Sequence, residues 1–83
     1  MKLNEIELIF NHGGFRECRI VEDEFQDKRF FKLVFISAIG GGVFLEAQRA
    51  GSPRQFVTVE SAVNVLRKIG CTDFNVRLMP CID

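Results

Sequence analysis

Apolar residues recur at helical spacing near the start of the chain. The apolar positions there are Leu3, Ile6, Ile9 and Phe10, with polar residues between most of them. Gly13 and Gly14 follow, and glycine suits the left-handed turn that commonly ends a helix. The pattern therefore predicts a first helix over residues 3–12.

A second helical stretch has clear signals at both ends. Its apolar stripe consists of Val59, Ala62, Val63, Leu66 and Ile69. Thr58 precedes the stripe, and a threonine there accepts a hydrogen bond from a free N–H of the first turn. Gly70 follows it, and Arg67 and Lys68 place positive charge where the helix dipole favours it. We expect a helix over Val59–Ile69 with its stripe in the core.

Between and after these helices the chain has the alternation and short apolar runs typical of β-strands. We expect strands over Phe15–Val21, Phe30–Ile39, Val43–Arg49 and Phe74–Leu78, and a short strand over 54–57. We expect a polar loop over Glu22–Lys28, a glycine loop over 40–42 and a turn over 51–53. This order predicts an α+β fold, α-β-β-β-α-β, with an antiparallel sheet of three or four strands and two helices packed on one face.

The hairpin around the glycine loop predicts two distinct sheet faces. A three-residue loop places Ile39 opposite Val43, and side chains then alternate between the faces. The face expected in the core carries Leu33, Phe35, Val43 and Leu45. The other face carries Lys32, Val34, Ile36, Phe44, Glu46 and Gln48. We interpret Val34, Ile36 and Phe44 as a candidate partner-binding patch, although strands also expose single apolar residues routinely.

Composition and charge narrow the class of protein. The 83 residues are enough for a single domain, 1–83, and a 47% hydrophobic content with nine Phe favours a folded core. Net charge is zero, but acids predominate in residues 1–27 and bases in residues 28–83. Among the bases, Arg49, Arg54, Arg67 and Lys68 are a candidate nucleic-acid-binding set. A solvated surface or an acidic protein partner would account for the same residues.

The cysteines and the apolar runs bear on location. Three widely spaced cysteines without a Cys-x-x-Cys motif favour reduced thiols in the cytoplasm over a disulfide scaffold. No apolar run reaches the length of a membrane span, and no signal-peptide pattern is visible. We therefore expect a cytoplasmic protein that is not associated with a membrane.

No set of residues indicates catalysis or metal binding. His12 stands at a predicted helix end, and the acids of residues 22–27 lack the spacing of a calcium loop. The Gly40–Gly42 run is followed by a strand, whereas a phosphate loop is followed by a helix. Cys18 and Cys71 have no neighbouring base, and we interpret them as small buried hydrophobes. We expect no cofactor, no metal and no small-molecule substrate.

Two resemblances to known proteins extend this interpretation. The order α-β-β-β-α resembles double-stranded RNA-binding domains, but those carry lysines at the start of the second helix. The stretch 58–62 here has Glu60 and no lysine, so RNA binding by that route is not expected.

The second resemblance is in the last third of the chain. The segment Pro53-Arg54-Gln55-Phe56, followed by an amphipathic helix, looks like the tail region of small bacterial plasmid-borne accessory proteins linked to partition or transfer. It implies a bacterial cytoplasm and a role in handling mobile DNA.

The sequence thus predicts a non-enzymatic binding or accessory module. We expect it to act through a protein partner or as a homodimer, with Val34, Ile36 and Phe44 in the contact. Nucleic-acid binding through the four basic residues is the alternative.

Overall fold

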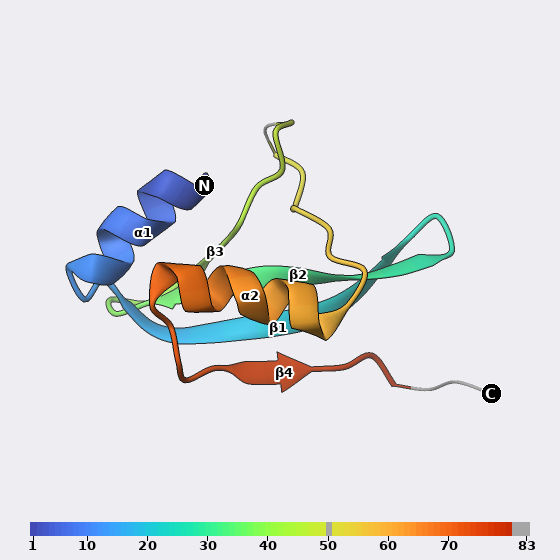
Figure 1. The fold of residues 1–83 in the computed structure, drawn as a ribbon. Helices are drawn as coiled ribbons and strands as arrows, with labels where there is room; N and C mark the ends of the chain where they lie inside the picture. The colour runs from blue at the N-terminus through green and yellow to red at the C-terminus, as the bar shows by residue number, and fades with distance from the viewer. Residues whose placement is uncertain (50, 81–83) are drawn as a thin grey trace.

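Four strands form one sheet, and both helices contribute to the core on one of its faces (Figure 1). The computed structural model describes residues 1–49 and 51–80. The elements are α1 (Leu3–Asn11), β1 (Phe15–Phe25), β2 (Lys28–Ser37), β3 (Gly42–Phe44), α2 (Val59–Ile69) and β4 (Asn75–Arg77). The order of strands in the sheet is β3-β2-β1-β4. The predicted α+β class is confirmed.

The sheet is mixed, whereas the sequence predicted an antiparallel one. β1, β2 and β3 are antiparallel neighbours, but β4 runs parallel to β1. The reason is the connection: the chain leaves β3 at one edge, crosses the sheet through α2 and returns as β4 at the other edge. A helical crossover of this kind joins parallel strands.

Helix α2 has the predicted bounds and both predicted caps. The Thr58 hydroxyl accepts a hydrogen bond from the Ser61 backbone N–H at 3.2 Å, and Gly70 takes the left-handed conformation with φ 101°. The stripe residues Ala62, Leu66 and Ile69 are buried. Helix α1 ends at Asn11, one residue before the predicted end, and its Ile6 belongs to the same buried cluster as Leu66.

The predicted loop over Glu22–Lys28 is wrong. β1 continues through the acidic residues to Phe25, and β2 begins at Lys28. The turn between them is the pair Gln26 and Asp27, both with positive φ (52° and 64°). A two-residue hairpin turn of this kind matches the twist of the strands. The acidic residues 22–24 therefore belong to β1 and not to a loop.

The predicted pairing of Ile39 with Val43 is also wrong. Val43 lies opposite Phe35 and Phe44 lies opposite Val34, so the turn is centred on Ile39 and Gly42 belongs to β3. The difference is an even number of residues, so each side chain stays on its predicted face. Leu33, Phe35 and Leu45 are accordingly buried, and Val43 packs against the core.

The strand predicted over Val43–Arg49 ends at Phe44, and the short strand predicted over 54–57 is reduced to one bridge between Phe31 and Phe56. Residues 45–49 and 51–55 belong to a loop that rises from the edge of the sheet (Figure 1). Its two arms are held together by hydrogen bonds from Ala47 N–H to the Ser52 carbonyl and from Arg54 N–H to the Leu45 carbonyl, both 2.9 Å. Within the described residues, neither helix is long and apolar enough to cross a membrane.

Candidate functional site

The candidate partner-binding residues lie together on the sheet face opposite the core. Val34 and Phe44 are direct cross-strand neighbours, and Ile36 is adjacent on β2, opposite Gly42. All three are half-buried. In the part of the chain that the structure describes, no helix covers this face (Figure 1). We call these three residues the apolar patch.

Charged side chains that neutralise one another border the apolar patch on β1. Glu17 lies opposite Ile36 and Arg19 opposite Val34. The Arg19 Nε donates to Glu17 Oε1 at 2.7 Å, and Asn75 Nδ2 of β4 donates to the same oxygen at 2.7 Å. These two hydrogen bonds lower the pKa of the Glu17 carboxyl to about 2, and the one from Arg19 has the larger effect. The carboxylate therefore stays ionised and paired at neutral pH.

An aromatic hollow of about 400 Å³ extends the apolar patch toward the β1–β2 turn. Its walls include Phe25, Phe30 and Phe44, with the ion pair of Asp23 and Lys32 (2.9 Å) alongside. Phe30 is only 6% exposed yet lies outside the main core cluster. The sequence reasoning missed this small second cluster because Phe25 was not placed on a strand.

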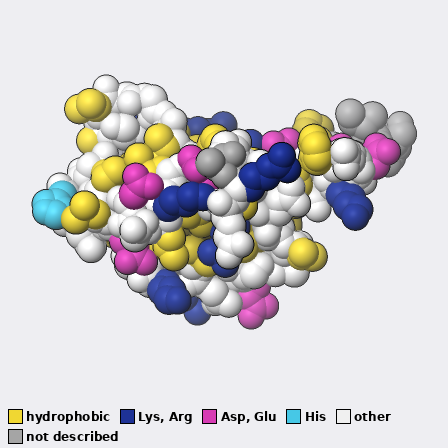
Figure 2. All heavy atoms as spheres, turned by 90° about the horizontal axis from the view of Figure 1, so that it is seen from above, with side chains coloured by type: hydrophobic (Ala, Val, Ile, Leu, Met, Phe, Trp, Pro, Cys, Tyr) yellow, Lys and Arg dark blue, Asp and Glu magenta, His cyan; other side chains and the backbone are white. Residues whose placement is uncertain are grey.

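A larger hollow, of about 830 Å³, lies between the start of α1 and the loop after β3. We call it the basic hollow, and its lining residues are Lys2, Leu3, Glu46, Ala47, Gln48, Arg49, Arg54 and Gln55. In the view from above, Lys and Arg side chains gather around this loop (Figure 2). The hollow thus brings together two members of the predicted basic set, Arg49 and Arg54. The other two, Arg67 and Lys68, lie in the last turn of α2 and do not line it.

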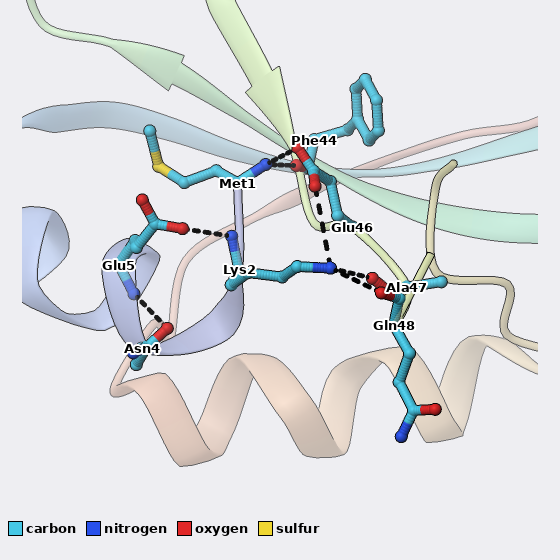
Figure 3. Close-up of polar contacts among 8 residues, drawn as sticks. All are labelled: Met1, Lys2, Asn4, Glu5, Phe44, Glu46, Ala47 and Gln48. Atoms are coloured by element: carbon cyan, nitrogen blue, oxygen red, sulfur yellow. Dashed lines mark hydrogen bonds and ion pairs between the residues drawn. The ribbon is translucent and has the colours of Figure 1, made fainter. Parts of the chain in front are cut away.

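A polar network fixes the wall of the basic hollow (Figure 3). The Met1 ammonium pairs with the Glu46 carboxylate, and Lys2 Nζ lies 3.8 Å from the other oxygen of that carboxylate. Lys2 Nζ also donates to the backbone carbonyls of Ala47 and, at 3.1 Å, of Gln48. The Met1 ammonium is the main reason why the pKa of Glu46 is lowered. The network ties the start of α1 to the loop.

The two arginines of the basic hollow are placed differently from Lys2. The Arg54 guanidinium lies over the buried Phe56 ring, 5.1 Å from its centroid, in a cation–π contact. The Arg49 carbonyl accepts a hydrogen bond from Ser52 N–H at 3.3 Å, which closes the loop turn. Within residues 1–49 and 51–80, neither guanidinium is in an ion pair.

The two described cysteines and His12 have contacts typical of structural residues. Cys18 and Cys71 are both buried, as predicted, and burial is the main reason why the pKa of the Cys18 thiol is raised to about 12. A thiol in that state is a poor nucleophile. The Nδ1 of His12 is 2.8 Å from the Leu8 carbonyl oxygen, at the end of α1. Cys81 lies outside the described residues.

Comparison with known proteins finds no family model, no curated protein and no solved structure that matches this chain.

Proposed function

We propose that this protein is a non-enzymatic binding module that self-associates through the apolar patch. The observation that supports the proposal is the contiguity of Val34, Ile36 and Phe44 on a sheet face that no described helix covers. The free energy falls when a partner covers apolar surface on such a face and removes it from water. The aromatic hollow enlarges this surface at one end.

Charge favours a second copy of the chain as the partner. The ion pairs Glu17–Arg19 and Asp23–Lys32 are satisfied within one chain, so the charges that border the apolar patch do not require a partner of opposite sign. A two-fold axis brings the same patch of two copies together. Sheets that pack face to face lie about 10 Å apart with interdigitated side chains. The resulting dimer is a sheet sandwich with the helices outside.

Sedimentation velocity over a range of concentrations tests this proposal. We expect the wild-type protein to show a concentration-dependent increase in mass, and the Phe44→Asp variant to remain monomeric because it places a charge in the contact. Leu8→Asp is the matched control, since Leu8 is 62% exposed on α1 and belongs to the helical side of the molecule. Its self-association should equal that of the wild type.

A second, milder variant keeps the test valid if Phe44→Asp misfolds. Val34→Thr has nearly the same shape and adds a hydroxyl to the patch, so it should weaken the dimer while the circular dichroism spectrum stays unchanged. A wild-type protein that is monomeric at high concentration would overturn the proposal. So would equal dissociation by Leu8→Asp and Phe44→Asp.

We also propose, from the sequence resemblance, a bacterial cytoplasmic setting and a role in the maintenance or transfer of mobile DNA. The support is the segment around Pro53–Phe56 and the helix that follows it. Coding sequences for partition or transfer proteins beside the gene would strengthen this proposal, and a chromosomal neighbourhood without such genes would count against it.

A further inference from the structure

The basic hollow carries an excess of positive charge. Its lining holds three cations, Lys2, Arg49 and Arg54, against one carboxylate, Glu46. That carboxylate is already shared between Lys2 and the Met1 ammonium. The charges of Arg49 and Arg54 are therefore not compensated by an acid in the described part of the chain.

The backbone beside both arginines, and the guanidinium of Arg54, are held in place before any ligand binds. Lys2 holds the carbonyls of Ala47 and Gln48, which immediately precede Arg49. The backbone of Arg54 is fixed by its 2.9 Å hydrogen bond to Leu45, and its guanidinium by the Phe56 ring. Stacking on a ring occupies the face of a guanidinium and leaves its N–H edge available to an acceptor. For Arg54, binding therefore requires little further ordering of the side chain, which favours affinity.

We propose that the basic hollow binds the phosphate group of a ligand, with Arg49 and Arg54 as the contacting residues and Lys2 as a positioning residue. A carboxylate has two oxygens, which one arginine can satisfy alone by a bidentate contact. A phosphate offers additional acceptor oxygens, so two arginines can bind it together. The hollow contains none of the three residues of the apolar patch, but it adjoins the same surface, because Gln55 also lines the aromatic hollow and the Met1 ammonium donates to the Phe44 carbonyl.

Two sources of phosphate are compatible with the hollow: the backbone of a nucleic acid and a small phosphorylated compound. Titrations of the isotope-labelled protein with inorganic phosphate and with a short oligothymidylate, each followed by NMR of the arginine Nε–H groups, distinguish them. A sodium chloride titration at matched ionic strength corrects for screening. The variants are Arg49→Gln and Arg54→Gln, with Arg67→Gln as a control that removes the same charge from the end of α2.

We expect saturable shifts of the Arg49 and Arg54 resonances, lost in either variant and retained in Arg67→Gln. If the source is a nucleic acid, the oligothymidylate binds more tightly than inorganic phosphate. The slope of log K against log salt is then about −1.4 for two contacts at about −0.7 each, and each variant reduces it by about half. If inorganic phosphate binds as tightly as the oligothymidylate, the site is one for small phosphorylated compounds.

Three results would overturn the proposal. The first is the absence of saturation by either ligand at low salt. The second is binding that Arg67→Gln weakens as much as Arg49→Gln, because that indicates diffuse attraction. The third is binding that neither hollow variant changes. Arg49 and Arg54 are exposed, and an unchanged amide NMR spectrum shows that each variant is folded.

Discussion

At the scale of single residues, Glu17 connects β1 to the short edge strand β4 by a side-chain hydrogen bond. β4 contributes three residues to the sheet, and Asn75, the first of them, donates to the Glu17 carboxylate of β1. Arg19 donates to both oxygens of the same carboxylate, at 2.7 and 3.0 Å. Of the two hydrogen bonds that lower the pKa of Glu17 to about 2, the second, from Asn75, therefore also helps to attach the edge strand β4 to β1.

The lowered pKa of Glu17 predicts an acid-dependent loss of stability. The carboxyl has a pKa near 4.5 when unperturbed and about 2 in the fold, so its contribution is complete above pH 4.5 and disappears as the pH falls toward 2. The Glu17→Gln variant lacks this contribution, because its amide does not titrate. We expect its unfolding free energy, measured by urea denaturation across this range, to fall less with decreasing pH than that of the wild type. Glu24→Gln, at an exposed position with no ion pair among the described residues, should follow the wild type.

The sequence could indicate some site residues and not others. Arg49 and Arg54 were identified because they flank a turn only a few residues long, and their proximity follows from local geometry. Lys2 was missed as their neighbour because it lies 46 positions from Gln48, whose carbonyl it contacts. Periodicity carries no information about such distant contacts, which depend on where α1 docks.

At the scale of elements, the predictions succeeded where a pattern had defined ends. α2 has an apolar stripe between a threonine cap and a glycine cap, and its observed bounds match the predicted ones. β1 continued through Glu22, Asp23 and Glu24 because each carboxylate meets a partner or solvent. Asp23 pairs with Lys32, Glu22 accepts a hydrogen bond from the Met79 N–H, and Glu24 is exposed. The direction of β4 could not be predicted, since alternation identifies the face of a strand but not its neighbour.

The β1–β2 turn predicts a stabilising substitution. Asp27 has φ 64°, and an L-residue in the left-handed region is less favourable there than glycine. We expect Asp27→Gly to raise the free energy of unfolding by about 1 kcal/mol. Asp73→Gly is the matched control, since Asp73 is exposed outside any helix or strand and has no positive φ, so glycine there should lower stability. A decrease in the thermal midpoint for Asp27→Gly would contradict this account of the turn.

At the scale of the whole molecule, one core unites both helices and the sheet. Ile6 of α1, Leu66 of α2, and Ile20 and Leu33 of the central strands are fully buried in a single cluster. The sequence predicted Leu33 and Leu66 in the core, from strand alternation and from helical spacing respectively. Because both helices pack into this one cluster, we expect them to unfold together.

The shared core predicts how a cavity in α1 affects α2. Ile6→Ala removes a fully buried side chain and should cost about 2–5 kcal/mol. If the core is one cooperative unit, hydrogen exchange will show equal loss of protection for the buried amides of α1 and α2, because both exchange through the same global opening. Leu8→Ala, on the exposed side of α1, should change protection little. Retention of full protection in α2 of the Ile6→Ala variant would instead show that α1 docks as a separate unit. The basic hollow would then open whenever α1 detaches, since Lys2, which precedes that helix, forms part of the wall of the hollow.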